Sequence, residues 1–126
     1  MIPPGTIENS TTPAAMAQTM ARIVTGDVLA PASRARLRDW MGRTRTGVRR
    51  IAAGVPQGWQ VLDKTGTGMR PGEGNKVNDI AVLLPPGRAP LVVTAYFENP
   101  VFSEDTRPSD EAVLKQVGAL VAEWVK

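Results

Sequence analysis

Hydrophobic residues in the second half of the chain come in short runs, and residues typical of turns lie between these runs. Three such runs, at 60–66, 78–84 and 91–97, have the length of strands rather than of helices. A segment rich in glycine and polar residues separates the first two runs, and Pro85-Pro86-Gly87-Arg88 separates the last two. A turn that tight between two apolar runs predicts a hairpin. We therefore expect three strands, at these bounds, that pair antiparallel.

Before the strands, the apolar residues recur at helical spacing. Thr12 is a predicted N-cap with Pro13 in the first helical position, and Gly26 suits the C-terminal end of that helix. Pro31 begins a second predicted helix, and 48–53 is expected to form one or two helical turns. The pattern thus indicates two or three helices over 13–53, ahead of the sheet.

A last amphipathic helix is predicted near the C-terminus. Ser109 is its expected N-cap, with Asp110 and Glu111 in the first turn, where the helix dipole favours acidic side chains. Its apolar stripe contains valines spaced four residues apart, which are Val113, Val117, Val121 and Val125. We expect this helix to lie on the sheet. We also expect the three tryptophans to pack in the core or between helix and sheet, namely Trp40, Trp59 and Trp124.

The helices and strands expected above make an α+β fold, and the composition is that of one small globular domain. The chain has 126 residues, of which 42% are hydrophobic and 21% charged, and its net charge is +3. It has no cysteine and no histidine. Disulfides, thiolate chemistry and a Ser-His-Asp triad are therefore excluded, and we expect no metal or other cofactor. The first residues lack the pattern of a signal peptide, and no apolar run is long enough to predict a membrane span.

The candidate chemistry lies at Lys64-Thr65-Gly66, which is followed by Thr67-Gly68. An ammonium, hydroxyl groups and glycines here follow directly on an apolar run. Because strand side chains alternate between faces, only one of Lys64 and Thr65 can point straight into a cleft. Gly66 and Gly68 leave room for a ligand or another backbone to approach. Such a set suits an anionic substrate with a reacting carbonyl group.

Several short segments before and after this motif occur in a characteristic order and at characteristic distances along the chain. They are Thr12-Pro13-Ala14, Gly54-Val55-Pro56, Asp63-Lys64-Thr65-Gly66-Thr67-Gly68, Asn78-Asp79-Ile80 and Arg88-Ala89-Pro90. In this arrangement nearly the whole chain resembles the C-terminal part of a class A serine β-lactamase, whose signature set is S-x-x-K, S-D-N and K-T-G. The resemblance implies the serine β-lactamase/transpeptidase-like fold and hydrolysis of a β-lactam amide through an acyl-enzyme. It assigns 1–12 to the end of a loop arm, 13–53 to the helical part and 60–126 to the sheet with its last helix.

Only the K-T-G motif of that set is present. No serine is followed three residues later by lysine, as Ser10, Ser33, Ser103 and Ser109 show. The resemblance also implies a loop glutamate, which would precede this sequence. We therefore expect the chain alone to be inactive and to require a complementary N-terminal β-lactamase polypeptide. That partner would also cover the apolar edge at 91–97, because an exposed edge of this kind invites pairing or aggregation. The family is exported, which implies a periplasmic or secreted location.

The resemblance implies a role for each motif residue. Lys64 would favour the substrate carboxylate and help proton movement, and Thr65 would donate its hydroxyl to that carboxylate. Thr67 would supply one backbone N–H of the oxyanion hole, and Gly66 would keep the strand close to the β-lactam ring. Together these make Lys64 and Thr67 the catalytic candidates, with Gly68 in the same substrate-binding strand.

A second cation for the carboxylate is expected from outside this strand. The position where many family members carry an arginine is Val77. An alternative context, Arg-Ile-x-Ala-Gly, is matched at Arg50, and we expect its guanidinium to bind the carboxylate through two N–H groups. Thr46 is expected to border the same pocket.

Three other interpretations remain open from the sequence. A penicillin-binding transpeptidase fragment would share K-T-G, although the flanking segments favour the lactamase. A truncated lactamase-like product without catalysis is also compatible. A nucleic-acid-binding module would use a basic stretch that almost no aromatic residues interrupt, formed by Arg34, Arg36, Arg38, Arg43, Arg45, Arg49 and Arg50. We expect no nucleic-acid or membrane partner.

Overall fold

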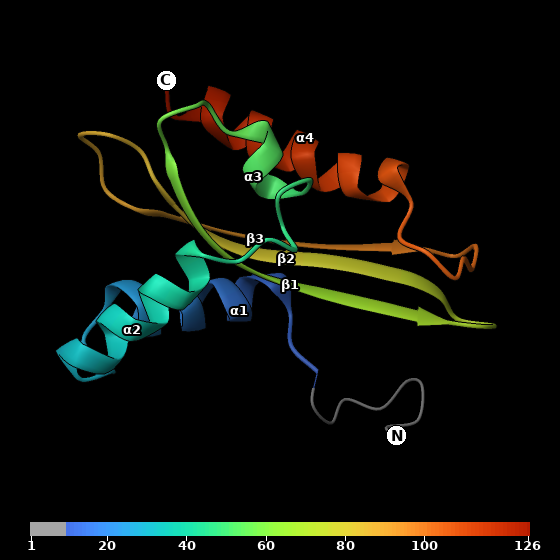
Figure 1. Ribbon diagram of the computed structural model, residues 1–126, viewed down its shortest axis with the longest axis horizontal. Coiled ribbons are helices and arrows are strands. Elements are labelled where there is room, and N and C mark those ends of the chain that lie inside the picture. The colour runs from blue at the N-terminus through green and yellow to red at the C-terminus, as the bar shows by residue number, and fades with distance from the viewer. Residues whose placement is uncertain (1–9) are drawn as a thin grey trace.

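A computed structural model describes residues 10–126, so most of the expected loop arm at 1–12 lies outside the described part. Three strands form one antiparallel sheet in the order β1-β2-β3. They are β1 (Gln60–Arg70), β2 (Gly74–Leu84) and β3 (Leu91–Asn99). Helices cover both faces of this twisted sheet, with α1 and α2 on one side and α3 and α4 on the other (Figure 1). The expected α+β class and antiparallel order are confirmed.

The hairpin between β1 and β2 is longer than its sequence predicts. Pairing continues through Thr67↔Val77 and ends only at Arg70↔Gly74, so the bounds 60–66 and 78–84 were too short. Gly72 and Gly74 have φ values of 84° and 78°, which glycine adopts readily and which close the chain in a tight turn. A side chain on Gly74 would also overlap the Asn99 carbonyl. The polar residues that signalled a loop therefore lie on a strand pair that projects beyond the helices (Figure 1).

The N-terminal helices begin where the caps predict. Helix α1 (Pro13–Met20) has Thr12 as its N-cap, whose hydroxyl accepts the backbone N–H of Ala15 at 3.1 Å. It continues into the π-helical turn η1 (Ala21–Thr25) and ends at Gly26. Helix α2 (Pro31–Gly42) begins with its proline, and α3 (Ile51–Gly54) is a single turn. The predicted helix at 48–53 is thus one turn that begins at Ile51.

Helix α4 (Pro108–Trp124) lies on the sheet as expected, but its cap differs from the prediction. Pro108 takes the first helical position and Arg107 is the N-cap residue, without a side-chain cap bond, so Ser109 lies inside the helix. Proline is preorganised for the first turn and disfavours helical geometry in the residue before it. Arg107 accordingly has an extended conformation, with φ −76° and ψ 137°.

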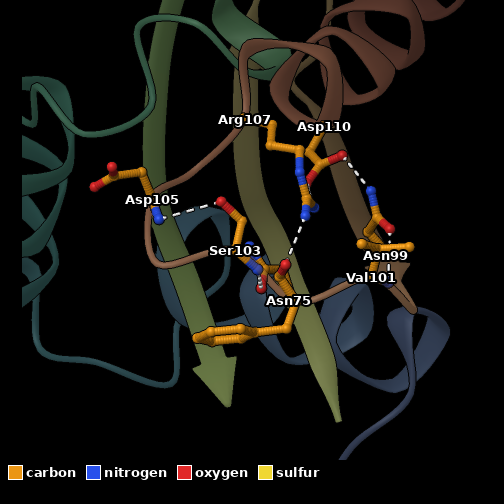
Figure 2. A network of polar contacts seen from close by, with 8 residues as sticks. Asn75, Asn99, Val101, Ser103, Asp105, Arg107 and Asp110 are labelled. Carbon is orange, nitrogen blue, oxygen red and sulfur yellow. Dashed lines mark hydrogen bonds and ion pairs between the residues drawn. The ribbon is translucent and has the colours of Figure 1, made fainter. Parts of the chain in front are cut away.

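Polar side chains fix the connection between β3 and α4 (Figure 2). Asn99 donates its amide to Asp110 at 2.9 Å, and Arg107 forms an ion pair with the same carboxylate at 3.4 Å. Asn75 on β2 accepts the backbone N–H of Ser103 at 3.1 Å. These contacts hold the first turn of α4 against the end of the sheet, beside the β1–β2 hairpin.

Two hydrophobic clusters lie on opposite faces of the sheet. The cluster beneath α3 and α4 contains Ile51, Val77, Ala81, Leu83, Val93 and Leu114. The cluster beneath α1 and α2 contains Met20, Val24, Met41, Leu62 and Val82. The sheet is therefore the middle layer of three, and β1 lies at its edge between the two helical layers.

Only one of the three tryptophans packs as the sequence predicts. Trp59 contacts the cluster beneath α3 and α4. Trp40 is 59% exposed and Trp124 is 81% exposed, so the expectation for these two was wrong. In α2 the inward positions belong to Leu37 and Met41, and Trp40 lies beside them rather than beneath the helix. Trp124 is the last residue of α4.

Candidate functional site

The K-T-G residues lie in the middle of β1, an edge strand of the described sheet. Alternation along the strand puts Lys64 on the face of Leu62, toward α1 and α2, and puts Thr65 and Thr67 on the opposite face. Lys64 is exposed, and its ammonium donates to the Thr65 carbonyl at 2.8 Å. The strand thus presents a cation on one face and two hydroxyl groups on the other.

Gly66 and Gly68 are not required by packing within the described residues. A Cβ on Gly66 would come no closer than 3.7 Å to Asn78, and one on Gly68 no closer than 3.8 Å to Lys76. Both distances are ordinary van der Waals contacts, and neither glycine has a positive φ. Packing among the described residues therefore gives no reason for glycine at these two exposed strand positions.

The segment between α2 and α3 lies beside the two threonines of the strand. Thr65 donates its hydroxyl to the hydroxyl of Thr46 at 2.8 Å. Arg50, at the end of the same segment, donates through Nη2 to the hydroxyl of Thr67 at 2.7 Å. The structure therefore brings Thr46 and Arg50 to the K-T-G strand, although these pairs are 19 and 17 residues apart in sequence.

The guanidinium of Arg50 is buried and extensively hydrogen-bonded. The residue is only 3% exposed. Its Nη1 donates to the carbonyls of Gly66 at 3.2 Å and Asn78 at 2.7 Å. Of the five N–H groups of a guanidinium, those on Nη1 are thus used and one on Nη2 bonds to Thr67. The Nε of the guanidinium has no hydrogen-bond partner among the described residues, and the Thr67 hydroxyl, which accepts from Nη2, still has its own proton to donate.

Val77, opposite Thr67 in the register, is fully buried in the hydrophobic cluster beneath α3 and α4. The positive charge next to Thr67 therefore comes from Arg50 and not from the residue opposite Thr67 on β2.

Sequence reasoning missed an acidic partner of Arg50. Glu111, in the first turn of α4, places Oε1 3.5 Å from Arg50 Nε, and its side chain is only 12% exposed. The sequence marks Glu111 as an acid near a helix N-terminus, which is a common place for one. Nothing local in the sequence shows that this turn faces residue 50, because the contact depends on how α4 packs against α3.

Two further acidic residues are buried behind the same strand. Asp63 on β1 and Asp79 on β2 are 5% and 0% exposed. Burial, and then the neighbouring Asp63 carboxyl, raise the pKa of Asp79 to about 7. Sequence reasoning missed Asp79, because an aspartate in a strand beside an asparagine has no distinguishing pattern.

Residues 10–126 contain no group of three histidine, cysteine, aspartate or glutamate side chains placed to hold a metal ion. No helix in that part of the chain is both long and apolar enough to cross a bilayer.

The family model of the β-lactamase enzyme family matches residues 4–125. The chain therefore belongs to this family. The structural neighbours place it in class A: it is similar to an ancestral class A β-lactamase (GNCA) with a TM-score of 0.85 and 46% identity, over 97% of this chain and 44% of that one. A putative class A β-lactamase, PenP from Rhodopseudomonas palustris, gives a TM-score of 0.84 at 45% identity over 96% of this chain.

Curated relatives agree with this. A β-lactamase of Mycobacterium tuberculosis (strain ATCC 25177 / H37Ra) is 42% identical over 95% of this chain and 38% of the relative. A β-lactamase of Amycolatopsis lactamdurans is 49% identical over 71% of this chain and 28% of the relative. The chain thus spans less than half the length of the proteins it matches. This bears out its resemblance to the C-terminal portion of a class A enzyme.

Proposed function

We propose that this chain supplies the K-T-G strand of a class A serine β-lactamase and acts when a complementary polypeptide supplies S-x-x-K, S-D-N and the loop glutamate. The reaction is hydrolysis of a β-lactam amide through an acyl-enzyme. The observation that carries the proposal is the hydrogen bond from Arg50 to Thr67, which couples a buried cation to a hydroxyl on the edge strand that bears the motif.

Lys64 and Thr65 hold the charged end of the substrate in this proposal. The Lys64 ammonium is exposed on the opposite face of this edge strand from the two threonines, and from that side it attracts the substrate carboxylate and assists proton movement during acylation. The Thr65 hydroxyl donates to the carboxylate after exchanging its present partner, the Thr46 hydroxyl at 2.8 Å. Thr46 stays beside it and borders the pocket.

Thr67 acts through its backbone. Alternate N–H groups of an edge strand point away from the neighbouring strand and are free to bind a ligand. We assign one of the two oxyanion-hole donors to the Thr67 N–H, and such a donor is worth about 3–4 kcal/mol in the transition state. Gly66 and Gly68 keep side chains away from the β-lactam ring, which accounts for two glycines that packing does not require.

The role that we propose for Arg50 differs from the one that its sequence context predicts, in which two N–H groups bind the substrate carboxylate directly. Its buried guanidinium acts through the Thr67 hydroxyl, which accepts from Nη2 and is thereby turned to donate its own proton toward the substrate carboxylate. Its positive charge also favours that carboxylate, and burial increases the effect because the local dielectric is lower than in water. Glu111 holds the guanidinium in place from α4.

The open edge of β3 supports the need for a partner. Within residues 10–126 no strand pairs with the outer side of β3, whose side chains are mostly half-buried and apolar. A complementary polypeptide that adds strands there would satisfy the free backbone groups. By family resemblance the completed enzyme is periplasmic or secreted, and its substrate is a β-lactam.

The basic stretch does not favour nucleic acid. One of its members, Arg50, is buried, and Arg43 forms an ion pair with Asp39 within α2 and its C-cap. Arg34 donates to the Gly26 carbonyl and so supports the fold.

The experiment that tests the proposal is complementation. The purified chain is mixed with a polypeptide that carries the other motifs of a class A enzyme, and turnover of a chromogenic cephalosporin is recorded. We expect no turnover by either part alone, turnover by the mixture, and loss of turnover with Lys64→Ala. Steady hydrolysis by the chain alone would refute the proposal. So would a soluble complex of the two parts without activity.

A further inference from the structure

Two buried carboxyl groups lie behind the K-T-G strand, and none of the roles proposed above uses them. Asp63 and Asp79 occupy the same face of the sheet as Thr65, because Thr65 pairs with Asp79 and is two residues from Asp63. Asp63 Oδ1 accepts the hydroxyl of Thr44 at 2.5 Å. Asp79 Oδ2 accepts the backbone N–H of Ile51 at 3.2 Å. Each carboxyl group therefore has one oxygen with a partner.

The remaining oxygens of the two groups, Asp63 Oδ2 and Asp79 Oδ1, are buried without a partner among the described residues. Asp63 lies close enough to Asp79 for its carboxyl group to raise the pKa of Asp79 further, beyond the effect of burial. Two ionised carboxylates at such a distance repel and cannot both be stable away from water. One proton between them turns the two orphan oxygens into a donor and an acceptor.

We propose that Asp63 and Asp79 share a single proton and act as positioning residues for the substrate-carboxylate site. This inference rests on the proposed function, since it concerns the same site. The pair joins β1 and β2 to the segment 44–51. It holds that segment by Thr44 at one end and by Ile51 at the other.

Between these two anchors lie the residues that touch the motif. Thr46 accepts the hydroxyl of Thr65, and Arg50 donates to that of Thr67. The backbone at Gly47 packs so closely on Asp63 that any Cβ there would overlap the carboxyl group. The carboxyl pair is therefore the surface on which segment 44–51 rests, and the position of Arg50 depends on it.

The charges around the pair make it sensitive to pH. Two charged groups act on Asp79 directly, Asp63 from β1 and Arg50 from the segment before α3. Glu111 on α4 acts indirectly, because it forms an ion pair with Arg50. When the shared proton leaves, three carboxylates compete for one guanidinium. Repulsion within the pair then loosens segment 44–51. Because Arg50 and Thr46 serve substrate binding, KM should rise before kcat falls.

The first arm of the test does not use activity. Aspartate labelled with 13C at the carboxyl carbon is followed by NMR during a pH titration of the full chain, alone and with the complementary polypeptide. We expect one aspartate resonance to titrate near pH 7, and Asp79→Asn and Asp63→Asn each to abolish that transition. Titration of every aspartate below about pH 5, close to the ordinary value, would overturn the shared proton. Survival of the neutral transition in both variants would overturn it too.

The second arm measures KM and kcat against pH in the complemented enzyme. We expect KM to rise about tenfold between about pH 6 and pH 8.5, the size of effect for one hydrogen bond to a charged group. Asp79→Asn should flatten this rise, since an amide still accepts from Ile51 and donates to Asp63. Asp39→Asn, which removes an exposed carboxylate on α2, should leave the rise intact. A rise that persists in Asp79→Asn would overturn the positioning role. Absence of any hydrolysis would refute the proposed function, while the NMR arm would still decide on the proton.

Discussion

Replacement of Arg50 by alanine tests how the buried cation serves the substrate. The guanidinium bonds to two carbonyl groups and to the Thr67 hydroxyl, and it pairs with Glu111. In the proposed function, the part of this set that acts on the substrate is the hydrogen bond to Thr67, at 2.7 Å. A hydrogen bond that involves a charged group contributes about 1.5–3 kcal/mol, so kcat/KM should fall roughly 10- to 150-fold. Arg50→Ala also leaves a buried carboxylate without its partner, which lowers stability.

The assay separates these two effects. It measures kcat/KM of the complemented enzyme on a penicillin and on the same penicillin with its ring carboxylate esterified, for Arg50→Ala and for Arg49→Ala. Arg49 is the matched control, because it is the adjacent arginine and is exposed. We expect the Arg50 loss on the acid only, and little loss for Arg49→Ala on either substrate. Thr67→Val should reproduce much of the Arg50 effect, since it removes the hydroxyl through which Arg50 acts. Equal losses on acid and ester, or a larger loss at Arg49, would refute the reasoning.

Three more predictions concern the surroundings of this cation. Glu111→Gln removes the ion pair at 3.5 Å and should lower the unfolding midpoint in thermal denaturation, whereas an unchanged midpoint would show that the pair contributes nothing. Because the folded-state pKa of Asp79 is raised from 3.8 to about 7, the folded chain holds a proton that the unfolded chain releases, so this group's contribution to stability falls as the pH rises from about 4 to about 7. The full loss is about 4 kcal/mol. Urea unfolding should show that the free energy of unfolding of Asp79→Asn increases relative to that of the parent chain as the pH rises across this range. A difference in unfolding free energy between the two chains that does not vary with pH would contradict this. Gly47→Ala should cost about 1–3 kcal/mol of stability in the same assay, because its Cβ would overlap the Asp63 carboxyl, and a neutral effect would contradict the close packing.

The elements of the fold could be predicted where a local signal specifies them. Thr12 and Pro13 mark the start of α1 because capping depends on a few adjacent residues. The Pro85–Arg88 turn similarly gave the β2–β3 hairpin. Ser109 was a wrong cap because a proline directly before it competes for the helix start, and that preference is stronger. The strands predicted at 60–66 and 78–84 stop short of the β1–β2 turn, because the projecting part of a strand pair needs no apolar alternation.

The candidate site was predictable only in its strand. Lys64, Thr65 and Thr67 are neighbours in sequence, so their alternation on β1 follows from strand geometry alone. Arg50 was found through its local context, yet its burial and its bond to Thr67 depend on how segment 44–51 packs on the sheet. Glu111 and Asp79 come from separate elements, and no local pattern in the sequence shows that they converge on that segment.

The acyl-enzyme itself gives the most direct measurement of the central claim, which is that this chain completes a β-lactamase without carrying its nucleophile. The complex of the chain with the complementary polypeptide is mixed with a slowly hydrolysed β-lactam, quenched in acid, and both polypeptides are weighed by intact-mass spectrometry. We expect the mass of one β-lactam to be added to the partner polypeptide, none to be added to this chain, and the adduct to form more slowly with Lys64→Ala. An adduct on this chain, or no adduct on either polypeptide in a properly formed complex, would contradict the claim.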